Sequence, residues 1–177
     1  MTDFSATLDF APIIFNSGCC SPGDWEESPE GVITIMSNKR RIAVVGTNRQ
    51  AETMVELFRQ APQYHLIEGL SAASSDGIDI VIETENVDLA DKRMSLQRIE
   101  QLACSETVIV SSILGVSATE AASWLRDGSR LTGFEVFGDV NKTGLIELAA
   151  PLQMDSSHME LVDGLFASLS KETVGSG

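Results

Sequence analysis

The fold class of this protein follows from the stretch GIDIVIET at residues 77–84, which continues as ENVDLADKR at residues 85–93. The first part is a short apolar run that is mainly β-branched. Such runs are typical of strands buried on both faces in a parallel sheet. The second part is a polar loop that leads into a helical pattern. Because ligands of open α/β sheets bind at the carboxyl ends of strands, Glu83 lies where a site is expected.

Strands and helices alternate along the rest of the chain. Capping boxes at residues 117–120 and 157–160 each predict the start of a helix. This alternation is typical of an α/β fold with a mostly parallel sheet, so we predict a three-layer, Rossmann-like fold with helices on both faces. The expected strands are 41–46, 65–68, 78–83, 107–111, 131–137 and 145–149, the expected helices are 49–61, 89–103, 118–126 and 158–169, and residues 173–177 are expected to be a frayed tail.

The first 40 residues differ from the rest in composition. Residues 16–31 contain several glycines and prolines, which indicates a loop, and residues 32–36 have the pattern of a strand. We predict that residues 1–40 form a strand-containing extension packed on a Rossmann-like domain of residues 41–177. Cys19 and Cys20 could have a redox role, but reduced thiols of a cytosolic protein explain them more simply.

Composition and charge exclude several classes of partner. The chain has 177 residues with 43% hydrophobic content, which is enough for one domain with a core. Its formal net charge of −14 disfavours phosphate backbones and anionic lipids, so we expect neither nucleic acid nor membrane as a partner. Its three cysteines and two histidines show no metal-ligand spacing, and we predict no metal site. No signal peptide or membrane span is evident, and a cytoplasmic location is expected.

Four segments, taken in order, resemble one known family. They are DIVIE at 79–83 with Lys92 and Arg93 downstream, SATE at 117–120, GFEVF at 133–137 and LIEL at 145–148. Their order and spacing resemble the NAD-binding domain of the 3-hydroxyacyl-CoA dehydrogenase family, over about three quarters of the chain. In length the chain is similar to the shortened Rossmann domains of some bacterial 3-hydroxybutyryl-CoA dehydrogenases. The resemblance implies NAD as cofactor and a link to fatty acyl-CoA metabolism.

The resemblance also assigns cofactor-binding positions, and one of them carries an unusual residue. The family's glycine-rich turn corresponds to GTNRQA at residues 46–51, so Gly46 keeps the first glycine and Ala51 is a small replacement for the third. Asn48 stands at the second position, where glycine lets the backbone approach the cofactor's diphosphate. Glu68 lies near the distance expected for an acid that binds the ribose, although a surface glutamate after a strand would look the same.

Glu83 and Lys92 complete the expected cofactor-binding residues. Lys92 matches the family's cofactor-contacting lysine, although a lysine on a solvated helix face needs no function. Val87 replaces the family's cofactor-contacting acid, and Leu114 replaces its active-site serine. These replacements predict that NAD binding is weak or absent.

The positions of the family's catalytic pair carry two glutamates. In the family, a hydride passes to NAD while a histidine, oriented by a glutamate, takes the proton. Glu147 matches the orienting glutamate, and Glu135 stands at the histidine position. Two facing carboxylates could act as an acid/base pair, because like charges resist simultaneous ionisation. Alternatively, Glu135 is a solvent-facing replacement at an inactive site, and the joint loss of serine and histidine favours this interpretation.

Three hypotheses about function remain open, and so does the question of whether the chain is an enzyme. In the first, it is a dehydrogenase-family domain with weak or no catalysis alone. The family's helical second domain is expected to be missing, so acyl-CoA would bind only if that domain were supplied. In the second, it is a non-catalytic Rossmann module that docks on a dehydrogenase-type partner, or on itself as a homo-oligomer. In the third, it is an NAD-dependent enzyme that uses Glu135 and Glu147.

Overall fold

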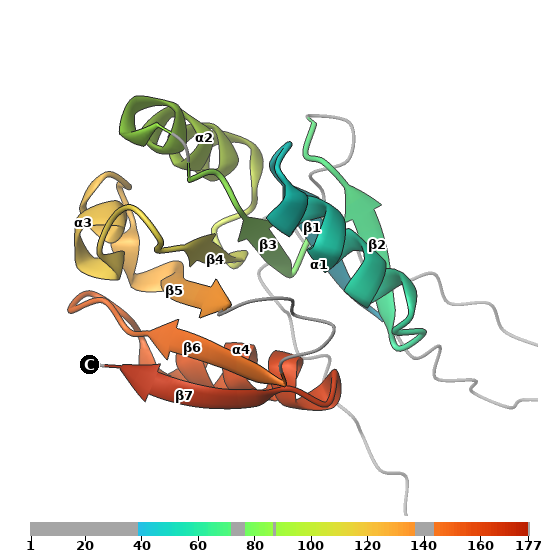
Figure 1. Ribbon diagram of the computed structural model, residues 1–177. Helices are drawn as coiled ribbons and strands as arrows, with labels where there is room; N and C mark the ends of the chain where they lie inside the picture. Colours follow the sequence, from blue (N-terminus) through green and yellow to red (C-terminus); the bar gives the residue numbers. More distant parts are fainter. Residues whose placement is uncertain (1–38, 72–76, 87, 137–143, 177) are drawn as a thin grey trace, which may run out of the picture.

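One sheet runs through the whole of the described chain. The computed structural model describes residues 39–71, 77–86, 88–136 and 144–176. Within these ranges, seven strands lie in the order β2-β1-β3-β4-β5-β6-β7 (Figure 1). Neighbouring strands are parallel except for β5 and β6, which are antiparallel, so the predicted mostly parallel sheet is confirmed. The strands are β1 (Arg40–Val45), β2 (Tyr64–Glu68), β3 (Ile80–Glu83), β4 (Val108–Ser112), β5 (Leu131–Val136), β6 (Leu145–Ala149) and β7 (Glu172–Ser176).

Helices cover both faces of the sheet, as the sequence predicts. Ile42 and Val44 of β1 belong to the core that α1 and α4 cover, whereas Ala43 belongs to the core that α2 and α3 cover. Successive side chains of a strand point to opposite faces, so an apolar strand in the middle of the sheet contributes to both cores. The helices are α1 (Arg49–Arg59), α2 (Leu89–Leu102), α3 (Ala118–Ser123) and α4 (Ser156–Ser168), with a 3-10 turn, η1 (Gly128–Arg130), before β5.

Side-chain caps fix where the helices begin. Ser117 Oγ accepts a hydrogen bond from Glu120 N, so the predicted start of α3 is confirmed. The start predicted for the last helix was wrong, because Asp155 caps α4 by accepting from the amide of Ser157. A carboxylate is a strong N-cap, and this one starts the helix at Ser156 rather than His158.

The predicted frayed tail at residues 173–177 was also wrong. Residues 172–176 form β7, which pairs in parallel with β6 at the edge of the sheet. The short sequence of β7 has little strand pattern of its own. It becomes a strand because α4 returns the chain to β6, whose backbone groups are available for pairing. A smaller difference is that α3 ends at Ser123 rather than at the predicted residue 126.

Some expectations fall outside the described residues. They are the strand-containing extension up to residue 38, the strand at residues 32–36, the Cys19-Cys20 pair, Val87, and residues 137 and 177. Arg40, which the sequence analysis assigns to the extension, is the first residue of β1. None of the helices in the described ranges has the length and apolar character needed to cross a bilayer.

Candidate cofactor and catalytic site

The carboxyl ends of β1, β3, β4 and β5 meet at one edge of the sheet, because these strands run parallel. Polar residues gather there, with Glu83 at the end of β3 paired in register with Ser111 of β4. The chain order also changes direction at β1, since β2 lies on one side of it and β3 on the other. Ligands of open α/β sheets bind at such a point. The candidate site is therefore the topological switch point between the carboxyl ends of β1 and β3.

The turn between β1 and α1 requires glycine at its first position. Gly46 has a φ of +143°, and a Cβ atom there would lie 2.1 Å from Thr84 Oγ1. Only glycine adopts this backbone without strain and leaves this space free. Ala51 is 5% exposed and packs against the same turn. The turn therefore lies directly against the segment that follows β3.

The Asn48 side chain joins these two segments. Its Oδ1 accepts a hydrogen bond from Ala51 N over 3.0 Å, and its Nδ2 donates to the carbonyl oxygen of Thr84. The backbone of Asn48 is extended, with φ of −96° and ψ of 172°, so its conformation does not require glycine. Asn48 thus caps α1 and also ties its first turn to the end of β3.

One residue of this turn departs from what a dinucleotide-binding turn has at its position. Diphosphate groups bind where the free N–H groups of a helix N-terminus point at the ligand. The second glycine of the turn normally leaves room for that approach. Here the Asn48 side chain fills that position and already accepts from the Ala51 amide. Gly46 and Ala51 suit a cofactor, but Asn48 does not.

Glu68 lies at the end of β2, beside β1, where an acid that binds a ribose would be expected. Its carboxylate is exposed and forms an ion pair of 2.5 Å with the guanidinium of Arg59 on α1. Exposed pairs of this kind contribute little to stability. The ribose-binding role of Glu68 stays a prediction.

Lys92 is not on a solvated helix face, and that alternative was wrong. Its side chain is 1% exposed, and its Nζ donates to Glu83 Oε2 and to Glu85 O, both over 2.8 Å. Glu83 also accepts from Ser111 Oγ and from the amide of Glu85, both over 2.7 Å. Burial raises the pKa of the Glu83 carboxyl, and the Lys92 ammonium opposes that rise. The two side chains form a buried ion pair that links β3 to α2, and both point inward.

Glu135 and Glu147 pair directly across the antiparallel strands β5 and β6. Residues paired in this way project from the same face of the sheet, so the structure brings the two expected catalytic positions together. Glu135 is only 8% exposed, which corrects the expectation that it faces solvent. Its Oε1 accepts from Val136 N over 2.9 Å and its Oε2 accepts from Ser112 Oγ over 3.2 Å. Burial follows from the central position of β5 in the sheet, which the sequence alone does not reveal.

Three polar residues beside Glu135 were missed by the sequence analysis. The Nδ2 of Asn86 donates to Gln50 Oε1 over 3.0 Å and to Ser112 Oγ over 2.9 Å, and Ser112 bonds to Glu135. A polar chain therefore runs from α1 to β5 along the sheet edge. The Oδ1 of Asn86 is buried without a hydrogen-bond partner. Ser112 carried a signal, as a polar residue at the end of a buried strand, whereas Gln50 and Asn86 meet only through the packing of loops.

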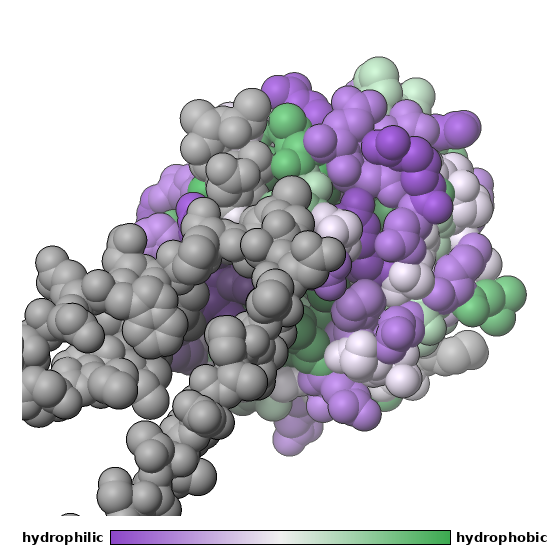
Figure 2. Space-filling model, turned by 180° about the vertical axis from the view of Figure 1, so that it is seen from behind, coloured by the Kyte–Doolittle hydropathy of each residue, from purple (hydrophilic) through white to green (hydrophobic). Residues whose placement is uncertain are grey.

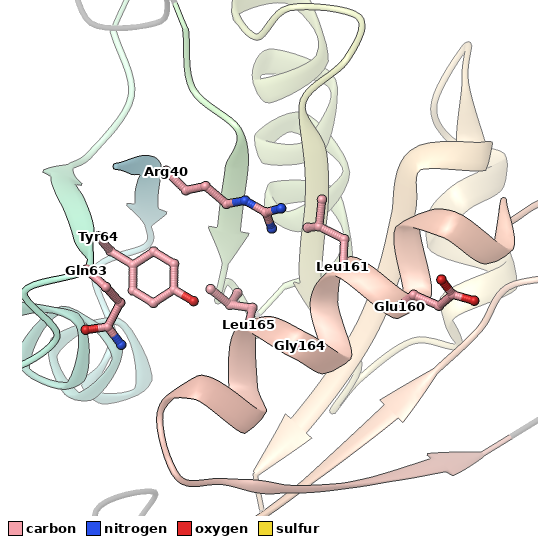
Figure 3. Close-up of a pocket in the computed structure, with 7 residues that line it drawn as sticks. All are labelled: Arg40, Gln63, Tyr64, Glu160, Leu161, Gly164 and Leu165. Carbon is pink, nitrogen blue, oxygen red and sulfur yellow. The ribbon is translucent and has the colours of Figure 1, made fainter. Parts of the chain in front are cut away.

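A cavity of about 430 Å³ lies at the opposite edge of the sheet, between α4 and the start of β1 and β2 (Figure 3). In Figure 3 the side chains of Arg40, Tyr64 and Leu165 converge on it, while the carboxylate of Glu160 points away. None of the expected site residues lines this cavity, so it is separate from the candidate site. The full lining is Arg40, Gln63, Tyr64, Glu160, Leu161, Gly164 and Leu165.

The described residues contain no group of three or more His, Cys, Asp or Glu side chains that is placed to hold a metal ion. His158 lies close to a backbone carbonyl, with its Nδ1 at 3.1 Å from Ser129 O. Leu114, at the position of the family's serine, is 70% exposed on the loop after β4. Among the described residues, the polar side chains at this end of the sheet carry carboxylates, amides, hydroxyl groups and the Lys92 ammonium.

Comparison with known proteins agrees with this architecture. The family model for the 3-hydroxyacyl-CoA dehydrogenase NAD binding domain matches residues 37–176. Among solved structures, the chain is similar to (S)-3-hydroxybutyryl-CoA dehydrogenase from Ralstonia eutropha, with 17% identity and a TM-score of 0.63 over 78% of this chain and 63% of that chain. It is also similar to 3-hydroxybutyryl-CoA dehydrogenase from Escherichia coli K12, with 15% identity and a TM-score of 0.67 over 78% of this chain and 38% of that chain.

The 3-hydroxyacyl-CoA dehydrogenase from Archaeoglobus fulgidus gives 20% identity and a TM-score of 0.60, over 77% of this chain and 56% of that chain. The chain thus spans less than two thirds of each of these three proteins. No curated protein matches the sequence. The glycine turn after β1, the order of the strands and the matched residues lead to one assignment. The chain belongs to the 3-hydroxyacyl-CoA dehydrogenase family, as its NAD-binding domain.

Proposed function

We propose that this chain is a Rossmann domain of 3-hydroxyacyl-CoA metabolism that does not oxidise a 3-hydroxyacyl-CoA by itself. In this proposal it binds NAD(H) weakly or not at all. The observation that carries the proposal is Glu135, which stands where the family's histidine takes the proton. A general base must reach the proton that it takes, whereas Glu135 is 8% exposed and its two oxygens are held by Val136 N and Ser112 Oγ.

The chain spans 63% of the Ralstonia eutropha enzyme and 38% of the Escherichia coli one. In this proposal, acyl-CoA binds only together with a second domain or with a partner of the dehydrogenase type. The proposal therefore concerns this chain alone.

The test combines a binding and an activity measurement on the unaltered chain. NADH is titrated while nicotinamide fluorescence and heat are followed, and the chain is incubated with NAD and 3-hydroxybutyryl-CoA while NADH absorbance is read. We expect no saturation by NADH at micromolar concentration and no turnover.

Turnover by the chain alone would contradict the proposal. Glu135→Gln would then test whether turnover depends on the Glu135 carboxylate. The matched control is Glu160→Gln, because Glu160 is an exposed carboxylate on α4. Loss of turnover in Glu135→Gln but not in Glu160→Gln would support a role of Glu135 as acid or base, and Glu147→Gln would then test its partner in the pair. An unchanged rate in both would exclude that pair.

A second candidate function is an interaction module that docks on a partner or on itself. Leu89, the first residue of α2, and Leu114, in the loop after β4, are 51% and 70% exposed. A Cβ on Gly115 would be 3.7 Å from Asn86 O, so the loop after β4 lies close to Asn86, which follows β3. Docking surfaces are marked by contiguous exposed apolar patches, whereas single exposed apolar residues are common on any protein. The face seen in Figure 2 is mostly hydrophilic where described residues are visible, and its apolar residues are scattered. For this second candidate we propose that Leu89 and Leu114 belong to the docking surface.

Light scattering and sedimentation test self-association of the chain. We expect a dimer or larger assembly that Leu114→Glu reduces, whereas Leu152→Glu, at a 91% exposed leucine after β6, leaves it unchanged. A strictly monomeric chain would count against self-docking.

A further inference from the structure

We propose that the side chain of Asn48 takes the place of a cofactor's diphosphate and that this residue, more than the altered catalytic positions, keeps a dinucleotide out. The inference deepens the proposed function, because it rests on NAD(H) binding being weak or absent. It names the residue that sets this affinity and the chemical group that is excluded.

At the switch point between β1 and β3, three hydrogen bonds involve one residue, Thr84. Thr84 donates its N–H to Val45 O over 3.0 Å and its hydroxyl to the same oxygen over 3.3 Å. Its own carbonyl accepts from Asn48 Nδ2. In an open α/β sheet the loops on either side of such a switch point diverge and leave a crevice for the ligand. Here the Asn48 side chain joins the loop after β1 to the segment after β3.

The oxygen and the nitrogen of the Asn48 side-chain amide each make one hydrogen bond in this turn. The oxygen accepts from Ala51 N, as a phosphate oxygen would at a helix N-terminus. The nitrogen donates to Thr84 O, which a phosphate cannot do. The amide thus satisfies a donor and an acceptor together, so the turn is complete without a ligand.

The start of α1 carries charges of both signs. Arg49 is the first residue of the helix, and Glu52 lies in its first turn, near the positive end of the helix dipole. The Glu52 carboxylate would repel a bound diphosphate, whereas the Arg49 guanidinium would attract it. The replacement of the diphosphate is therefore assigned to the Asn48 amide, and Glu52 adds a separate repulsion that a substitution can remove.

The experiment measures binding of NADH, ADP-ribose and AMP by calorimetry to the full chain, to Asn48→Gly and to the double variant Asn48→Gly/Glu52→Gln. Freeing the Ala51 amide for a charge-assisted hydrogen bond should tighten NADH and ADP-ribose by about tenfold in Asn48→Gly. The double variant should gain further. AMP lacks a diphosphate and should gain little, which locates the effect at that group.

The matched control is Asp155→Gly, which removes the N-cap of α4 at the opposite edge of the sheet. It should leave all three affinities unchanged, because loss of a helix cap elsewhere does not open the turn. Circular dichroism establishes that each variant is folded. If Asn48→Gly does not fold, Asn48→Ser replaces it in the test. Serine keeps an acceptor for the first turn of α1 but has no amide nitrogen to donate to Thr84 O. Its affinity for NADH and ADP-ribose should therefore increase, but less than in Asn48→Gly.

Unchanged binding of NADH and ADP-ribose in the folded Asn48→Gly chain would overturn the role of Asn48, and so would an equal gain for AMP or in Asp155→Gly. If Asn48→Ser is the variant tested, unchanged affinity for NADH and ADP-ribose would also overturn the role of Asn48. Micromolar binding of NADH by the unaltered chain would contradict both this inference and the weak binding in the proposed function. The two are distinguished by the other results: turnover of 3-hydroxybutyryl-CoA by the unaltered chain contradicts only the proposed function, and unchanged binding in Asn48→Gly contradicts only the role of Asn48.

Discussion

Lys92 shows how a residue that matches a family position can also contribute to the fold. Its ammonium and the Glu83 carboxylate are both buried, 2.8 Å apart, and each has further hydrogen bonds. A buried pair contributes little net stability, because desolvation offsets most of the attraction between the two charges. Removing one partner has a large effect, because the other charge is then left buried and unpaired.

Lys92→Met should therefore lower the free energy of unfolding by about 3–5 kcal/mol, measured by urea denaturation. The double variant Glu83→Gln/Lys92→Met should recover much of this loss, because no charge is left unpaired. Arg59→Met, which breaks the exposed pair with Glu68, is the control and should change stability little. A Lys92→Met chain as stable as the unaltered one would show that the buried pair does not matter to the fold.

At the scale of elements, α4 and β5 differ in how much room they leave for a side chain. Gly164 lies inside α4, and a Cβ atom there would meet nothing within 4 Å. Gly133 lies in β5, where a Cβ atom would be 2.6 Å from Ile113 Cγ2 and 2.9 Å from Ala118 Cβ. The first glycine weakens its helix, whereas the second lets α3 pack closely on the sheet.

Gly164→Ala should raise the free energy of unfolding by about 0.5–1 kcal/mol, because alanine restricts the unfolded chain and favours a helix. Gly133→Ala should lower it by about 1–3 kcal/mol, because the added methyl group overfills the core. Thermal unfolding followed by circular dichroism measures both. A lower free energy of unfolding in Gly164→Ala would contradict this prediction, because it would mean that the added methyl group is not accommodated beside α4.

At the scale of the whole molecule, Glu100 of α2 connects distant parts of the chain. Its carboxylate accepts from the amides of Arg126 and Asp127 over 3.1 and 3.0 Å, and it lies 3.8 Å from the guanidinium of Arg130. Burial opposes ionisation of this group, but the two amides and the guanidinium groups outweigh it and lower the pKa of Glu100 below its ordinary value of 4.5.

This lowered pKa makes stability depend on pH. The contribution of ionised Glu100 is complete above its unfolded-state pKa near 4.5 and is lost as the pH falls through the lower pKa of the folded state. The difference in unfolding free energy between the unaltered chain and Glu100→Gln should therefore be constant near neutral pH and shrink below pH 4.5. Urea denaturation across this range measures it. A difference that does not change with pH would exclude this role of Glu100.

Much of the fold could be predicted from the sequence, and the candidate site only in part. The apolar β-branched run at residues 80–82 predicts a buried strand, and Ser117 with Glu120 predicts the start of α3, because both signals are local. The sequence also places Gly46, Asn48 and Ala51 in one turn. It could not predict β7, since that strand depends on the edge of β6 and not on its own residues.

By itself, the sequence determined the layers, the family and the positions of the glutamate pair, because periodicity, caps and the order of motifs are properties of the chain. Only the tertiary structure decided what those side chains do. It buried Lys92 against Glu83, enclosed Glu135 beside Ser112, and joined Asn48 to Thr84 at the switch point between β1 and β3. The physical reason is that burial and hydrogen bonding are set by residues far apart in the chain, which meet only when the sheet has formed.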